Sequence, residues 1–189
     1  MPRPLRDDHP EAWHHVMNRS IDRLPIFADE IDCRIFLTEL RDAASAHAIE
    51  VHGFCLLTNH FHLMLFAPRG GLSPTMQKLG ARFTQAVNRR RARDGPIFRG
   101  RFKSVQIATD SQLVQTSLYI HLNPVKAGLV IRPELWPWSS AKAYSGIGEA
   151  FDWLRTDCIL QMLGTADPQQ AYRALLESNS GIRNSGSDP

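Results

Sequence analysis

The stretch that most constrains this chain is a short apolar and aromatic run that holds two histidines, Asn59-His60-Phe61-His62-Leu63-Met64-Leu65-Phe66. The loop sequence Ala67-Pro68-Arg69-Gly70-Gly71 ends it, so the run is too brief for a helix and predicts a strand. Side chains alternate between the two faces of a strand, which places His60 and His62 on the same face with their imidazoles close together. Such a pair can form a metal clamp or the start of one. A pair of ordinary, partly buried histidines stays an equally open interpretation.

Composition limits the class of protein. A chain of 189 residues with 43% hydrophobic residues fits one domain with appendages and an ordinary core. The net charge is only +3, but the sequence pI is about 9.0 and the basic residues cluster within 82–103. This cluster favours a polyanionic partner, with a solvated basic face as the alternative.

The cysteines and the apolar runs predict a cytoplasmic location. Cys33, Cys55 and Cys158 are far apart and lack C-x-x-C spacing, which indicates neither a zinc-thiolate site nor a disulfide framework. Scattered cysteines suit a reducing compartment. No apolar run approaches the roughly 18 residues that a membrane span needs, and we expect no membrane partner.

Hydrophobic periodicity and turn residues predict the order strand, helix, strand, strand, helix, strand, helix. The expected ranges are 13–18, 29–47, 51–58, 60–66, 72–93 (capped by Ser73), 97–107, and 109–122, where Pro124 stops or restarts the helix. This order predicts an α+β fold of the ferredoxin-like split β-α-β type, an antiparallel sheet with two helices on one face. The third helix is the candidate to lie on the open face. We expect a domain over 12–145, a helical extension over 146–177 with short helices at 157–163 and 168–177, and a disordered tail over 178–189.

The predicted strand 97–107 carries a basic stripe. Strand alternation would put Arg99, Arg101 and Lys103 on one face, with Phe98 and Phe102 on the other. Such a surface can follow a phosphate backbone. An edge strand protected by charges is the alternative.

Two polar residues of the last predicted helix add to the histidine pair. Tyr119 and Asn123 are four residues apart, so they share a face of a continuous helix. If that helix crosses the sheet near His60 and His62, a divalent cation held by two imidazoles and one oxygen keeps open positions for phosphate oxygens. The Tyr119 phenol is then a plausible nucleophile. A half-buried helix tyrosine and an asparagine that caps the Pro124 turn are the alternatives.

The remaining histidines lack such a pattern. His121 is two residues from Tyr119, so it should face away and act structurally. Nothing in the spacing of His14, His15, His47 and His52 raises them above core or surface histidines.

Four segments together resemble a known family. They are His14-His15-Val16-Met17-Asn18-Arg19, Asn59-His60-Phe61-His62-Leu63-Met64-Leu65, Pro96-Ile97-Phe98-Arg99-Gly100-Arg101-Phe102-Lys103, and the stretch from Tyr119 to Val130 that contains Asn123-Pro124-Val125-Lys126-Ala127-Gly128. Over residues 12–145, and in matching order, the chain is similar to the REP-associated tyrosine transposases. These are single-tyrosine members of the HUH nuclease superfamily.

This resemblance implies a metal-dependent transposase that cuts and rejoins single-stranded DNA at hairpins formed by REP-like palindromes. It implies that His60 and His62 bind Mg²⁺ or Mn²⁺, that Tyr119 forms a 5′-phosphotyrosine link, and that Asn123 occupies the place of a third metal ligand. We expect a monomer or homodimer. The expected DNA contacts are Asn18, Arg19, Arg82, Arg89, Arg90, Arg91, Arg99, Arg101, Lys103 and Lys126.

Two other functions fit the same pattern. The fold also serves RNA-binding modules of the RRM type, whose sheet aromatics stack bases, although histidines stand here where aromatics would be expected. A metal-dependent hydrolase would instead use water, with Tyr119 only orienting the substrate.

Overall fold

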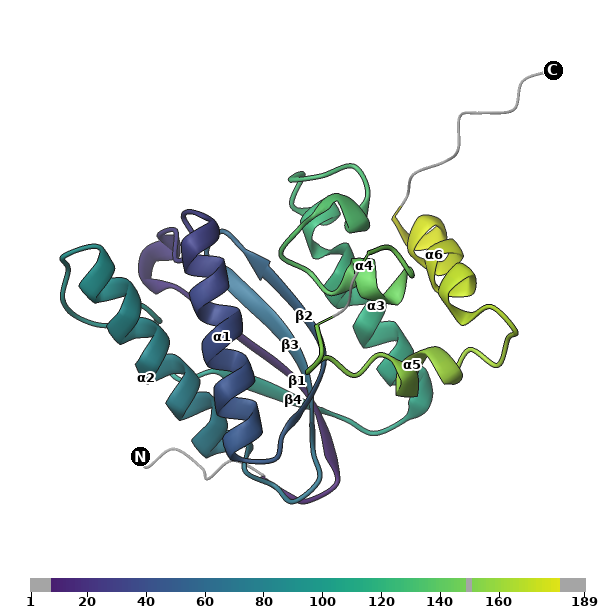
Figure 1. Ribbon diagram of the computed structural model, residues 1–189, viewed down its shortest axis with the longest axis horizontal. Coiled ribbons are helices and arrows are strands. Elements are labelled where there is room, and N and C mark those ends of the chain that lie inside the picture. Colours follow the sequence, from purple (N-terminus) through teal and green to yellow (C-terminus); the bar gives the residue numbers. More distant parts are fainter. Residues whose placement is uncertain (1–7, 149–150, 181–189) are drawn as a thin grey trace.

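The computed structural model describes residues 8–148 and 151–180, and its centre is a four-stranded antiparallel sheet (Figure 1). The strands are β1 (Ala12–Arg19), β2 (Glu50–Leu57), β3 (His60–Ala67) and β4 (Lys103–Ile107), in the spatial order β2-β3-β1-β4. β2 and β3 form a tight hairpin, as expected from their close spacing in the sequence. The predicted α+β fold with an antiparallel sheet is confirmed.

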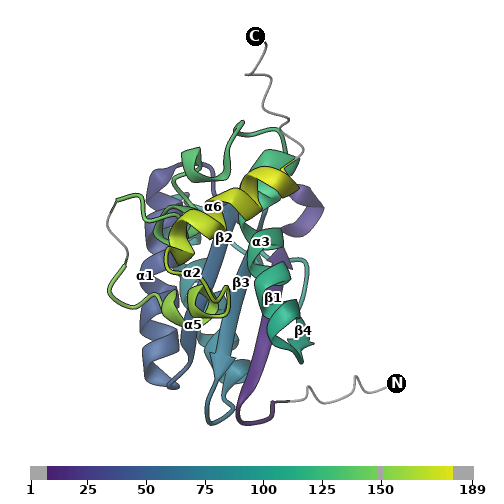
Figure 2. The ribbon, with the colours of Figure 1, turned by 90° about the vertical axis from the view of Figure 1, so that its right-hand side faces the viewer.

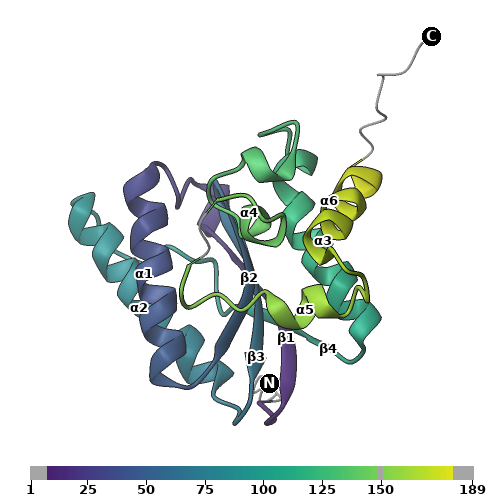
Figure 3. The ribbon, with the colours of Figure 1, turned by 45° about the vertical axis from the view of Figure 1, so that its right-hand side comes forward.

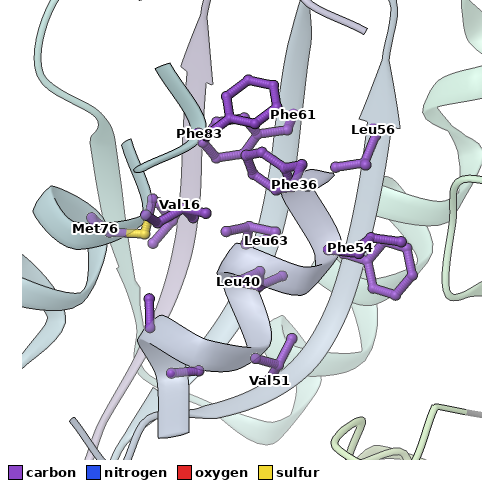
Figure 4. Close-up of a cluster of buried hydrophobic side chains, with 14 of the residues drawn as sticks. Val16, Phe36, Leu40, Val51, Phe54, Leu56, Phe61, Leu63, Met76 and Phe83 are labelled. Carbon is purple, nitrogen blue, oxygen red and sulfur yellow. The ribbon is translucent and has the colours of Figure 1, made fainter. Parts of the chain in front are cut away.

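Two long helices cover one face of the sheet. They are α1 (Glu30–Ala46) and α2 (Leu72–Arg90), which pack against each other beside the strands (Figure 1). Alternate residues of β3 are buried in this core: Phe61 and Leu63, which Figure 4 shows, and Leu65. The intervening residues of β3 therefore point to the opposite face, and these include both histidines.

Helix α3 (Asp110–Lys126) lies on that opposite face, together with the C-terminal helices (Figures 2 and 3). Thr109 is the N-cap of α3: its side-chain oxygen accepts a hydrogen bond from the Gln112 backbone N–H at 3.2 Å. The smaller elements are 3₁₀ turns at Ile21–Arg23 and Pro133–Leu135 and helices α4 (Ala141–Tyr144), α5 (Asp157–Gln161) and α6 (Pro168–Asn179). The face of the sheet that carries His60 and His62 is thus covered by α3 and not by α1 or α2.

The predicted strand over 97–107 is wrong in its first half. The regular pairing with β1 is confined to Lys103–Ile107, while 97–102 forms an irregular strap in which Phe98 makes one isolated antiparallel bridge to Ser20. The Asn18 side-chain N–H donates to Gly100 O at 3.1 Å, and the Arg99 backbone N–H donates to Arg19 O at 3.0 Å. These contacts with residues far away in the sequence hold the strap where a continuous strand was predicted. The expected separation of basic and aromatic side chains is nevertheless present, because Phe98 and Phe102 pack in or against the core whereas Arg99, Arg101 and Lys103 are exposed.

The start of α2 also differs from the prediction. Ser73 does not cap it, because the helix already begins at Leu72, after Gly71 in the left-handed region (φ 91°). The Asp8 carboxylate accepts hydrogen bonds from the backbone N–H groups of Leu72 (2.8 Å) and Ser73 (3.1 Å). A residue remote in sequence therefore supplies the cap.

Pro124 neither stops nor restarts α3, which continues to Lys126. Proline has no N–H to donate to Ile120 O one turn earlier. The Asn123 side-chain amide donates to Tyr119 O at 2.8 Å and to Ile120 O at 3.4 Å. This local replacement keeps the helix continuous, so Tyr119 and Asn123 belong to one helix as expected.

The C-terminal expectations are met in part. Short helices form near the predicted places as α5 and α6, and the Asp167 side chain caps α6. Helix α6 reaches Asn179, beyond the predicted start of the tail at 178, and residues 181–189 lie outside the described part of the chain. α6 packs against α3, and the division of the chain into a domain over 12–145 and an extension stays a prediction. Within the described ranges, no helix is both long and apolar enough to cross a membrane.

Candidate active site

His60 and His62 point from β3 toward α3, as strand alternation predicts. Their ring centroids lie 5.3 Å apart. His62 is buried, with 5% of its surface exposed, whereas His60 is half-buried. The strand therefore presents one imidazole deep in the site and one near its mouth.

Both histidines use the same ring nitrogen for a protein hydrogen bond. His60 Nδ1 lies 2.7 Å from Asn59 Oδ1, and His62 Nδ1 lies 2.9 Å from His15 Nε2. An amide oxygen can only accept, so His60 Nδ1 carries the proton and its Nε2 has a free lone pair. Nitrogen with a free lone pair is what a metal ion binds.

His15 is a site residue that sequence reasoning missed. It was expected to be a core or surface histidine, yet its ring stacks on His62 with a centroid separation of 5.1 Å. The reason is the antiparallel register of β1 and β3, which pairs Met17 with His62 and brings His15 to the same face one pleat further on. An alignment of β1 beside the strand that carries His60 and His62 is the signal that could have identified His15.

Tyr119 lies over this group of rings. Its ring centroid is 5.7 Å from those of both His15 and His62, and 43% of its surface is exposed. The Lys126 ammonium sits 4.7 Å from the centre of the tyrosine ring, two helical turns further along α3. The phenol of Tyr119 therefore lies beside His62, one of the two imidazoles that the sequence places on this face.

Burial sets the protonation of the histidines. It lowers the pKa of His62 to about 3 and that of His15 to about 4, and it also lowers the pKa of His60, with Arg19 adding to that effect. All three are neutral near pH 7. Neutral imidazoles such as His60 and His62, whose hydrogen bonds described above use Nδ1 and not Nε2, fit a divalent cation.

Among the residues that the structure describes, no acidic, histidine or cysteine side chain joins His60 and His62 as a third ligand. Over residues 8–148 and 151–180, no three such side chains are grouped to hold a metal ion. Asn123 directs its amide N–H groups to the backbone of its own helix. Its role as a ligand through the side-chain oxygen stays a prediction.

A groove of about 790 Å³ opens beside the two histidines. Its walls come from β1, the β2–β3 turn and the strap over 97–102, and many of the groups are basic or amide side chains. The lining residues are Met17, Asn18, Arg19, Arg23, Asn59, His60, His62, Arg99, Gly100, Arg101, Phe102 and Lys103. Five of the expected DNA contacts thus lie next to the histidines; these are Asn18, Arg19, Arg99, Arg101 and Lys103.

The arginines of α2 lie on the other side of the sheet. Arg90 and Arg91 form ion pairs with the Asp32 carboxylate, which is fully buried, and Arg90 also pairs with Asp29 and lowers the pKa of that carboxyl. A buried carboxylate needs such partners, so these two arginines hold α2 to the start of α1. Arg82 lines a separate groove of about 1080 Å³ between α2 and the strap, which also includes Arg101. Arg89 lies near the end of α2 beside Arg93.

Comparisons with known proteins agree with this arrangement. A Haemophilus influenzae protein (strain ATCC 51907 / DSM 11121 / KW20 / Rd) described as "Putative REP-associated tyrosine transposase" is 28% identical over 116 residues, 56% of this chain and 66% of the relative. A solved structure described as "Structure of the REP associates tyrosine transposase bound to a REP hairpin" matches with a TM-score of 0.66 and 18% identity, covering 82% of this chain and 98% of the other. The predicted resemblance to REP-associated tyrosine transposases is confirmed. No protein-family model matches the chain.

The sequence match to the REP-associated tyrosine transposase covers slightly less than two thirds of that protein's length. The structural match extends over most of this chain and shows the same fold. The group formed by His15, His60, His62 and Tyr119 therefore lies in a fold shared with a REP-associated tyrosine transposase.

Proposed function

We propose that this chain is a metal-dependent transposase that cuts and joins single-stranded DNA at hairpins through a 5′-phosphotyrosine link. The observation that carries the proposal is the Tyr119 ring, 5.7 Å from His62 on a helix that crosses the sheet. Support also comes from the named relative and from the structural neighbour, which holds a REP hairpin. We propose hairpins of the same REP-like kind as the substrate.

The proposed reaction is an exchange of phosphodiester bonds. The Tyr119 phenol loses its proton to solvent as its oxygen attacks phosphorus and forms a P–O bond, while the bond from phosphorus to the 3′ oxygen breaks. That oxygen takes up a proton and leaves as a free 3′-hydroxyl, and Tyr119 retains the 5′-phosphate of the other fragment. Attack by a second 3′-hydroxyl reverses the step and joins DNA, with no net loss of phosphodiester bonds.

His60 and His62 would hold Mg²⁺ or Mn²⁺ through their Nε2 atoms, with Asn123 as the proposed third ligand. When bound, the cation would supply Lewis-acid polarisation of the scissile phosphate. The ammonium of Lys126, 4.7 Å from the ring centre, would stabilise negative charge that develops on the phenol during attack. Arg99, Arg101 and Lys103 would contact phosphates along the groove, which positions the strand without reading its sequence.

The decisive experiment follows covalent joining. A 3′-labelled hairpin oligonucleotide with single-stranded flanks is incubated with the chain and Mn²⁺, and the products are separated on a denaturing gel. We expect a labelled protein band that EDTA abolishes and that Tyr119→Phe lacks, while Tyr119→Phe still binds the hairpin.

The other functions give different products. A hydrolase that uses water would release a cut, labelled fragment with no attached protein, including from Tyr119→Phe. A binding module without catalysis would shift the hairpin on a native gel and leave it uncut. Either pattern would refute the proposed transposase.

A further inference from the structure

Each of the two candidate metal-binding histidines is held by a different neighbour at the same ring atom. His60 Nδ1 meets Asn59 Oδ1 at 2.7 Å, and His62 Nδ1 meets His15 Nε2 at 2.9 Å. Imidazoles that bind metals commonly donate their second N–H to such a partner, which fixes both the tautomer and the ring orientation. His60 and His62 thus share one pattern, in which a protein partner meets Nδ1.

The Asn59 contact has a defined direction. The Asn59 side-chain N–H donates to Arg23 O at 3.2 Å, so the amide oxygen must be the atom that faces His60. Asn59 stands in the turn between β2 and β3, one residue before His60. The turn therefore holds the ring of His60 from the end of its own hairpin.

The His15 contact is held from the neighbouring strand. The His15 ring stacks on His62 with planes 28° apart, and it also meets the edge of Tyr119, 5.7 Å away between centroids. His15 Nε2 is the atom in contact with His62, so Nδ1–H of His62 can donate to it when His15 carries its own proton on Nδ1. This leaves Nε2 of His62 free, as at His60.

We propose that His15 and Asn59 are positioning residues that fix His62 and His60 in the tautomer whose Nε2 binds the divalent cation. This inference rests on the proposed metal-dependent function. It assigns His15 outside the ligand set, which agrees with the lack of any group of three His, Cys, Asp or Glu ligands among the residues that the structure describes. Strand β1 would then contribute His15 to the site, in addition to the proposed DNA contacts Asn18 and Arg19.

The atom in contact allows a sharp choice of variants at position 15. Glutamine can place its side-chain oxygen near the position of imidazole Nε2, and asparagine is one methylene too short to do so. Phenylalanine keeps the ring stacked on His62 but has no acceptor. We therefore compare His15→Gln, His15→Asn and His15→Phe.

The measurement is Mn²⁺ affinity, determined by electron paramagnetic resonance of the free ion during titration of the full chain. All variants carry Tyr119→Phe, which prevents covalent chemistry while a hairpin is present. We expect His15→Phe and His15→Asn to weaken Mn²⁺ binding by about 10- to 100-fold, the range for loss of a ligand's hydrogen-bond partner. His15→Gln should recover most of the affinity.

Asn59 is tested in the same way. Asn59→Leu should weaken Mn²⁺ binding by a similar factor, whereas Asn59→Asp, which keeps an acceptor for His60, should not. The matched control is His47→Gln, at the end of α1 on the opposite face of the sheet, which should leave Mn²⁺ affinity unchanged. Urea unfolding of each variant shows whether a loss of affinity reflects a loss of folded protein.

The outcomes separate this inference from the proposed function. Failure of the Tyr119→Phe chain with His15 and Asn59 intact to bind Mn²⁺ would refute both. Normal Mn²⁺ binding by that chain, with equal affinity in His15→Phe and Asn59→Leu, would refute the positioning roles alone. So would a His15→Gln variant that binds no better than His15→Phe.

Discussion

Removing the hydroxyl of Tyr172 should destabilise the protein because it breaks a buried hydrogen-bond chain between α6 and α3. The Tyr172 hydroxyl donates to Ser117 Oγ at 2.9 Å and lies 2.7 Å from His121 Nδ1. Because its one proton goes to Ser117, the hydroxyl oxygen accepts from His121 Nδ1–H. The other ring nitrogen, His121 Nε2, lies 2.7 Å from Ser140 Oγ. Every member of the chain is buried.

The expected cost follows from what Tyr172→Phe leaves behind. The ring still fills its place, so no cavity forms, but the N–H of a completely buried His121 loses its acceptor. A buried donor without a partner costs about 1–3 kcal/mol, and Ser117 loses one accepted hydrogen bond besides. We expect the free energy of unfolding to fall by about 2–3 kcal/mol.

Urea denaturation followed by circular dichroism measures this change, with Tyr119→Phe as the matched control. The Tyr119 side chain is 43% exposed, so its hydroxyl can be replaced by water and its loss should change stability by less than about 0.5 kcal/mol. The dependence of stability on urea should stay the same in both variants, since the surface exposed on unfolding does not change. A Tyr172→Phe protein as stable as Tyr119→Phe would show that the chain of hydrogen bonds does not hold the C-terminal extension to α3.

Three further predictions follow from charges and burial. Lys103→Ala should make the plot of log hairpin affinity against log salt concentration less steep by about one unit, the contribution of one phosphate contact. Arg34→Ala, on α1, should leave that slope unchanged. Equal slopes for the two variants would show that Lys103 does not contact the DNA. Asp32→Asn should lower the free energy of unfolding, measured in urea, by about 3 kcal/mol. This is the low end for breaking a buried ion pair, because the two arginine partners of Asp32 are partly exposed. An unchanged urea midpoint would contradict the role of Asp32 in holding α1 to α2. Burial lowers the pKa of His121 from 6.5 to about 3. Between these pH values the unfolded chain binds a proton at this histidine that the folded chain does not. The free energy of unfolding should therefore fall by about 1.4 kcal/mol per pH unit from this group as the pH drops from about 6.5 toward 3. His121→Gln should flatten that dependence in urea titrations at several pH values, and an unaltered curve would refute it.

Local patterns were enough to predict the main elements and to place His60 and His62 on one face of a strand. The strand with His60 and His62 follows from a run too short for a helix, and α3 follows from Thr109 and the apolar spacing after it. Both patterns are complete within a few residues. The meeting of Tyr119 with the histidines needed only the further step that a third helix covers the open face of the sheet.

The features that were missed depend on residues far apart in the chain. His15 joins the site because β1 and β3 pair in one particular register, which no spacing within β1 reveals. Asp8 caps α2 from more than sixty residues away, so the prediction that Ser73 caps this helix is wrong. The strap over 97–102 is held to Asn18 and Arg19, which displaced the strand that its alternating sequence suggested.

Helix α3 connects the stability of the fold to the proposed chemistry, because its two sides do different things. Tyr119 and Lys126 face the histidines and the solvent, whereas Ser117 and His121 face the buried chain that reaches α6. Residues two apart on a helix point in nearly opposite directions, so the backbone at Tyr119 can move relative to His62 only if the buried side of α3 also moves. The Tyr172→Phe variant should therefore lower the rate of covalent joining as well as stability, under conditions where it is fully folded. If that rate stays equal to wild type, the position of the phenol must be set by the DNA or by the site itself, and not by the C-terminal helices.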